Sequence, residues 1–276
     1  MMAAIINRQQ LKADTKSMLA TARVSPKAMI ALYLGITIVL DLIVTLIGDL
    51  GLASTFISIL IALLLLVLDA GFVLYCMDIR RGETSGFLTL FDGFSFVGKL
   101  IGLPLVIYVF VFLWSMLFVI PGIIAGYRYR FAVYNLCENP ELGIFEALNM
   151  SKQQTMGYKT QLFMLDLSYI GWTILADLPA TIYSSYFQIE AVSSAMSVYA
   201  LEGLQPTLAT PGFLPLWGWY LLTGLWHLAV AIFYLPGRYC VELGYFEIAK
   251  ETSGIGSRPS EQGSFQSGPD DMGGFY

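Results

Sequence analysis

Long, uninterrupted apolar blocks are the feature of this sequence that most limits how it can fold. Hydrophobic residues make up 57% of the chain and charged residues only 13%, whereas a typical soluble domain has about 25% charged residues. Blocks of about 20 apolar residues match the length of helix that crosses a ~30 Å hydrocarbon layer. The sequence therefore predicts an all-α integral membrane protein.

The number of apolar blocks predicts a polytopic bundle of about six transmembrane helices. We expect them over residues 28–48, 53–77, 99–120, 122–138, 160–183 and 213–236. The first block is too long for the apolar region of a signal peptide, so we expect it to remain as a span. The fourth is short, and Pro121-Gly122 favours a break at its start, so it either spans fully or enters and leaves on one side.

Two amphipathic segments are expected to lie at the membrane interface. In the first, residues 7–24, Asn7 is a candidate N-cap. One face of the predicted helix, with the basic residues largely off it, carries Leu11, Thr15, Met18, Leu19 and Ala22. Such a helix rests on anionic headgroups or packs on its own protein. In the second, Asn139-Pro140 is expected to start a short helix with an apolar stripe at Leu142, Phe145 and Leu148.

These elements suggest three parts. Residues 1–26 form a basic amphipathic segment, residues 27–250 a six-span transmembrane domain, and residues 251–276 a tail rich in Gly and Ser. The tail is expected to be disordered because it has too little apolar surface to order itself.

The distribution of basic residues predicts the orientation of the chain. All 15 Lys and Arg lie in the N-terminal segment, in residues 78–99, in the fourth block, in residues 138–159 and beyond residue 237. The turns at 49–52 and 184–212 hold none, although they contain Asp49, Glu190 and Glu202. The positive-inside rule then places both termini in the cytoplasm of a plasma membrane protein.

Several polar side chains fall inside the predicted spans, where an unpaired charge costs about 2.5–3.5 kcal/mol or more. We hypothesise that Arg128 and Arg130 pair with Asp69 and Asp41, because these residues lie at similar depths on different helices. Such pairs either fix the helix register or line a pathway for a solute or protons; alternatively, the arginines extend to the membrane surface. The candidate intramembrane residues are Asp41, Asp69, Arg128, Arg130, Asp166 and His227.

The loop after the second block carries the motif Arg81-Gly82-Glu83. Cations at a helix C-terminus followed by glycine are typical of a helix stop, which accounts for Arg81 and Gly82 but leaves Glu83 without a structural role. The three cysteines, Cys76, Cys137 and Cys240, are interpreted as small apolar residues near helix ends. No spacing in the sequence predicts a catalytic, cofactor or metal site.

Several separate stretches resemble a known family. The N-terminal RQQLKADTK, RRGETSGFLTLFDGF (80–94), LWSMLFVIPGIIAGYRYRFAVYNLCENPE (113–141), EALNMSKQQTMGYKTQLF (146–163) and LSYIGW (167–172) follow one another in order. Over roughly residues 8–250 the chain resembles the bacterial integral membrane proteins catalogued as domain of unknown function 975. The resemblance implies a bundle of about six spans and distant kinship with the membrane domain of some glycerophosphodiester phosphodiesterases. It implies no catalytic residues.

Three classes of function remain open from the sequence. The first is a non-enzymatic envelope scaffold or accessory protein, which would bind protein partners or a second copy of itself. The second is a small-solute or lipid transporter that uses buried Arg/Asp pairs, although no inverted repeat is evident. The third is a membrane enzyme acting on lipids. In each case we expect membrane lipids with anionic headgroups as partners, and no nucleic acid or cofactor.

Overall fold

The structure is a computed structural model that describes residues 6–47, 51–200 and 215–256, with the backbone alone for residues 187–200 and 216. Within these ranges the regular elements are all helical. They are α1 (Arg8–Thr21), α2 (Pro26–Ile47), α3 (Leu52–Arg81), the 3₁₀ segment η1 (Phe87–Phe96), α4 (Val97–Leu117), α5 (Val119–Arg128), α6 (Ala132–Glu138), α7 (Ile144–Gln154), α8 (Lys159–Ala200) and α9 (Leu216–Ser253).

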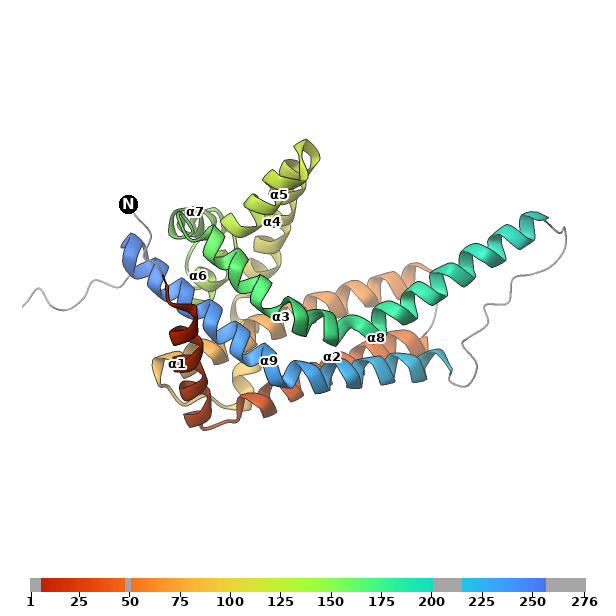
Figure 1. Cartoon of the computed structure of the whole chain (residues 1–276), viewed down its shortest axis with the longest axis horizontal. Coiled ribbons are helices and arrows are strands. Elements are labelled where there is room, and N and C mark those ends of the chain that lie inside the picture. The colour runs from red at the N-terminus through yellow and green to blue at the C-terminus, as the bar shows by residue number, and fades with distance from the viewer. Residues whose placement is uncertain (1–5, 48–50, 201–214, 257–276) are drawn as a thin grey trace, which may run out of the picture.

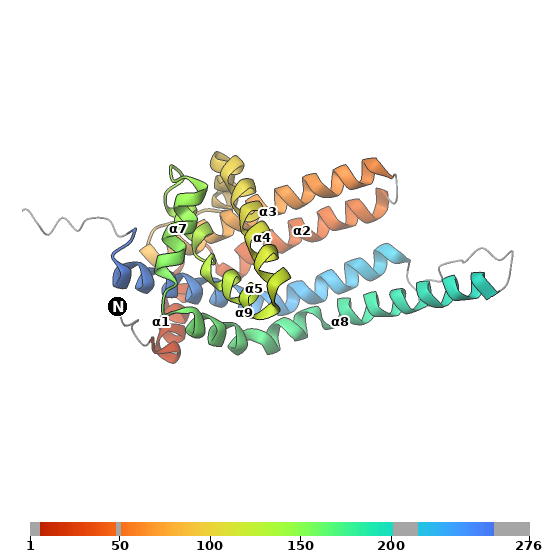
Figure 2. The ribbon, with the colours of Figure 1, turned by 90° about the horizontal axis from the view of Figure 1, so that it is seen from above.

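Four long helices, α2, α3, α8 and α9, run alongside one another and form the body of the molecule (Figures 1 and 2). The described residues contain five helical stretches long and apolar enough to cross a membrane. They are Pro26–Ile47, Leu52–Arg81, Phe87–Leu117, Lys159–Tyr186 and Trp217–Ser253. The predicted class, an all-α polytopic membrane protein, is confirmed.

The predicted spanning helix over residues 122–138 is not a single helix. Helix α5 ends at Arg128, a turn follows, and α6 begins at Ala132. The chain reverses at Phe118, which has an extended backbone, and α5 then packs back along α4. Gly122 permits the close approach, because a Cβ there would lie 2.0 Å from the Ser115 hydroxyl oxygen. The segment is therefore the second arm of a helical hairpin.

The α4–α5 hairpin projects from the side of the four-helix body (Figure 1). Its outer half is strongly apolar and exposed, with side chains that have no partner helix within the described chain. The exposed residues are Leu105, Tyr108, Val109, Phe112, Leu113, Trp114, Met116, Leu117, Phe118, Val119, Ile120, Ile123 and Ile124.

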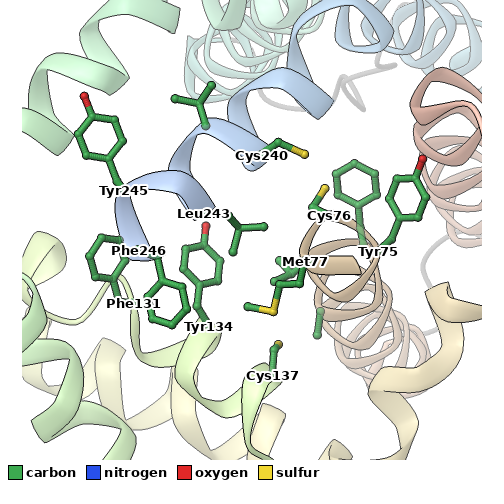
Figure 3. Close-up of a cluster of buried hydrophobic side chains, with 14 of the residues drawn as sticks. Tyr75, Cys76, Met77, Phe131, Tyr134, Cys137, Cys240, Leu243, Tyr245 and Phe246 are labelled. Carbon is green, nitrogen blue, oxygen red and sulfur yellow. The ribbon is translucent and has the colours of Figure 1, made fainter. Parts of the chain in front are cut away.

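One end of the body carries most of the described charged residues and much of the buried core; we call it the charged end. Here α1, α6 and α7 pack around the last turns of α3 and the second half of α9 (Figure 2). Figure 3 shows part of this core, in which Phe131, Tyr134 and Phe246 contact one another through their ring edges and faces. The charged end is thus a packed helical layer rather than a set of loops.

Helix α1 begins as the sequence predicts. The Asn7 side chain accepts hydrogen bonds from the backbone N–H groups of Gln9 and Gln10 at 3.2 and 3.3 Å. The predicted apolar stripe packs on the protein itself, with Thr15 fully buried and Leu11 lying against Gly244 of α9. The sequence left open whether this helix rests on lipid headgroups or packs on its own protein. The face that carries Leu11 and Thr15 packs on the protein.

The second predicted interfacial helix begins later than expected. Helix α7 starts at Ile144, and its first turn is capped by Glu146, whose side chain accepts from the Gly143 N–H. Asn139 instead closes a local turn by accepting from the Glu141 N–H at 3.1 Å. Of the predicted stripe, Leu142 lies before the helix, Leu148 is buried, and Phe145 is 65% exposed on the surface of the chain.

Helix α8 continues to Ala200, so the loop predicted to start at residue 184 is helical at first. Pro179 lies within α8, where it removes one backbone hydrogen bond, and the helix bends in this part of its course (Figure 1). The predictions for Asp49, for Glu202 and for the tail beyond residue 256 fall outside the described residues.

Candidate functional site

Arg130 is the centre of the largest buried charge cluster in the described chain. It lies in the turn between α5 and α6, and its guanidinium group sits between two carboxylates. It donates to both oxygens of Glu242 at 2.6 and 2.7 Å, and to both oxygens of Asp166, through Nη2 at 2.9 Å and through Nη1. Burial alone would lower the pKa of Arg130, but the two carboxylates raise it, so the group remains a cation.

Asp166 of α8 joins this centre to two further elements. It also accepts from the Tyr127 hydroxyl at 2.8 Å and from Arg238 of α9 at 3.3 Å. The formal charges of Arg130, Arg238, Asp166 and Glu242 cancel. The centre therefore connects α5, α8 and α9 without a net charge.

The predicted partners of the two arginines are wrong. Arg130 pairs with Asp166 and Glu242, while Asp69 accepts a 2.6 Å hydrogen bond from the Tyr239 hydroxyl. No ion pair of Arg128 is found within the described ranges; its backbone carbonyl accepts from Ser151 and Thr155 of the α7 region. The expected depths of the two arginines do not apply, because residues 122–138 do not form one spanning helix.

Arg81-Gly82-Glu83 forms the predicted helix stop. Gly82 has a φ of +73°, and its N–H bonds to the Ile79 carbonyl while the Glu83 N–H bonds to the Asp78 carbonyl at 2.9 Å. These two bonds define a Schellman motif. They give Glu83 a structural role through its backbone, and its side chain is exposed.

The arginines of this stop also tie α3 to the rest of the charged end. Arg80 donates to Glu247 of α9 at 2.6 and 2.9 Å. Arg81 donates to Glu138 of α6 at 3.0 Å, and Lys250 of α9 donates to the same carboxylate oxygen at 2.6 Å. Three helices that are distant in sequence are thereby joined.

Asp41 and His227 lie apart from the Arg130 centre, in a different site. Both line a cavity of about 290 Å³ between α2, α8 and α9, together with Asp177. The His227 Nε2 atom is 3.5 Å from Asp177 Oδ1. Thr37 and Thr223 add hydroxyl groups to the wall. The described residues hold no cluster of three or more His, Cys, Asp or Glu side chains arranged for a metal ion.

Sequence reasoning missed Glu242 and Arg238 because the sixth span was expected to end at Pro236. Helix α9 instead continues through Pro236 to Ser253. One signal was present: Arg238 and Glu242 are four residues apart, a spacing that places both on one face of a helix. This spacing predicts that the helix continues beyond Pro236, but it does not predict that Glu242 pairs with Arg130.

Fold and site together define a multi-pass helical membrane protein whose charged end is held by buried ion pairs. The family model described as "Protein of unknown function (DUF975)" matches residues 116–201. The predicted resemblance is confirmed over these residues, which include Arg130 and Asp166 but not Glu242. Comparison with curated proteins and with solved structures gave no match.

Proposed function

We propose that this protein is a non-enzymatic scaffold or accessory protein of the cell membrane, with both termini in the cytoplasm. The observation that carries the proposal is the double carboxylate clamp on Arg130. A charge held by four hydrogen bonds to fixed carboxylates is suited to joining helices rather than to meeting a passing solute.

The packing of α1 supports the proposed orientation. Arg8 and Lys12 of α1 bond to Met164 and Ser168 near the start of α8, and Leu11 contacts Gly244 near the end of α9. Both described ends of the chain thus lie at the charged end, which requires an even number of crossings. Four crossings by α2, α3, α8 and α9, with the α4–α5 hairpin entering from the charged end, satisfy this requirement. The positive-inside rule then puts the charged end in the cytoplasm.

The α4–α5 hairpin supplies the surface for a partner. The rings of Phe110 and Tyr129 stack at the base of α5, and the reversal at Phe118 lies eight residues beyond Phe110, about 12 Å at helical rise. The exposed apolar face of the hairpin would meet lipid or another helix within the membrane. We propose that another membrane protein or a second copy of this chain packs there.

Photo-crosslinking in the native membrane tests this role. A benzophenone amino acid at Val109 or Phe112 on the hairpin is expected to capture a discrete protein, identified by mass spectrometry. The same amino acid at Phe56 or Leu60 on α3, which are slightly more exposed than Val109 and Phe112, is the control. Capture of lipid alone at all four positions would contradict the proposal.

The cavity that contains Asp41, Asp177 and His227 supports a second candidate, a pathway for a cation or for protons. Carboxylates and a histidine at membrane depth are typical of proton relays. Liposomes with the purified protein would show a proton or cation flux that Asp41→Asn abolishes. Equal flux with and without the protein would exclude this candidate.

A further inference from the structure

A second and larger cavity, of about 730 Å³, lies at the charged end, and none of the four charged residues of the Arg130 centre lines it. Its walls come from α1, from the start of α2, from the first third of α8 and from the middle of α9. Basic groups line one part of the wall, and aromatic side chains line another, among them Trp172 of α8 and Phe233 of α9. This juxtaposition differs from an ordinary packing defect, which is apolar throughout.

The basic part of the wall is contributed by Lys12, Lys16 and Lys27. No acidic side chain is among the described residues that line the cavity. Lys12 donates to the Ser168 hydroxyl at 3.0 Å and lies 4.3 Å from the centre of the Tyr169 ring, while Lys27 lies over Phe233. Burial and the nearby Arg8 lower the pKa of Lys12, as expected for an ammonium group without a counter-ion.

Thr15 is an independent sign that the cavity takes a polar ligand. The residue is 1% exposed and lines the cavity between the two lysines of α1. Its hydroxyl group has no hydrogen-bond partner within the described chain. A buried hydroxyl without a partner costs about 1–3 kcal/mol. Less than 1 Å² of this oxygen is exposed, so a ligand oxygen would bond to it after the Thr15 side chain turns toward the cavity.

The aromatic part of the wall opens toward the apolar surface of the body. Trp172 and Phe233 are 46% and 70% exposed, and Phe233 belongs to the membrane-spanning part of α9. A ligand that reaches both parts of the wall needs an anionic head and an apolar chain. Free phosphate would satisfy only the lysines.

We propose that this cavity binds one anionic glycerophospholipid, with its phosphate beside Lys12, Lys16 and the Thr15 hydroxyl and an acyl chain along Trp172 and Phe233. The site requires only that the charged end lies at the level of the headgroups. It does not depend on the scaffold role, and a failure of the hairpin crosslinking experiment would leave it untouched.

Native mass spectrometry of the full chain in detergent, titrated with phosphatidylglycerol or phosphatidylcholine, tests the proposal. We expect one phosphatidylglycerol to be retained in preference to phosphatidylcholine. Lys12→Gln with Lys16→Gln should weaken retention about fivefold for each lysine removed, since a basic residue near a lipid surface contributes about that factor. Lys152→Gln, a change of the same kind on the exposed face of α7, is the control and should have no effect.

A second variant separates the cavity from general surface charge. Gly237 lines the cavity, and a Cβ there would meet only the Tyr169 hydroxyl, at 4.0 Å. Gly237→Leu should therefore occupy part of the cavity and reduce lipid retention while all three lysines remain. Equal retention by Lys12→Gln/Lys16→Gln and Lys152→Gln variants would overturn the proposal. Equal thermal stabilisation by inorganic phosphate and by phosphatidylglycerol would also overturn it, because the aromatic part of the wall would then contribute nothing to binding of the acyl chain.

Discussion

Arg130 and Glu242 are 112 residues apart in the chain and are joined by two hydrogen bonds of 2.6 and 2.7 Å. This pairing fixes the turn between α5 and α6 on the second half of α9. Glu242 is buried, so removal of the guanidinium group would leave a desolvated carboxylate without its cation. Removal of the Glu242 carboxylate, by contrast, would leave Arg130 paired with Asp166 alone.

We predict that Arg130→Leu lowers the free energy of unfolding by about 3 kcal/mol, because it leaves partly buried carboxylates uncompensated. Adding Glu242→Leu should restore part of the loss, while adding Asp69→Leu should restore none. Thermal unfolding of the purified protein in detergent measures all three variants. Arg23→Leu, on an exposed arginine, is the control for loss of charge alone. Rescue by Asp69→Leu rather than Glu242→Leu would contradict the observed pairing.

The sequence predicted the membrane class because apolar length is a local property that lipid imposes on each helix separately. The Asn7 cap and the Gly82 stop were predictable for the same reason: their hydrogen bonds are made within a few residues. The partner of Arg130 was not predictable in this way. Several carboxylates satisfy the same charge rule, and only the packing of α5, α8 and α9 selects Asp166 and Glu242.

Close packing of α3 against η1 leads to a second prediction. A Cβ on Gly71 would lie 1.9 Å from the Leu90 backbone carbonyl oxygen, which cannot move aside as a side chain could. Gly71→Ala should therefore destabilise the protein by about 3 kcal/mol. Gly35→Ala in α2 meets no atom within 4 Å and should be neutral or stabilising by about 0.5–1 kcal/mol, because alanine favours the helix. Equal unfolding temperatures for the two variants would contradict the packing.

The buried cysteines lead to a third prediction. Burial, with a smaller contribution from Asp69, raises the pKa of Cys137 to about 12, and the thiolate is the reactive form. The folded protein should therefore resist a maleimide at pH 7–8, with the Cys137 thiolate increasing about tenfold per pH unit below its pKa. Mass spectrometry after labelling measures this, with Ser17→Cys as an exposed positive control. Rapid modification of all three native cysteines without denaturant would contradict the buried core.

Because the native cysteines are all buried, single introduced thiols can test the hairpin topology. If α4 and α5 enter and leave on one side, the reversal near Val119 stays inside the membrane, whereas Leu52 at the start of α3 faces the outside. An impermeant maleimide added to intact cells should therefore label Leu52→Cys but not Val119→Cys. Both residues are strongly exposed in the protein, at 80% and 72%, so burial within the chain cannot explain a difference. Phe145→Cys on α7 should react only after the membrane is opened, because α7 lies at the charged end. Labelling of Val119→Cys from outside as fast as Leu52→Cys would mean that α4 crosses the membrane completely, and the ten residues of α5, about 15 Å at helical rise, would then be too short to return.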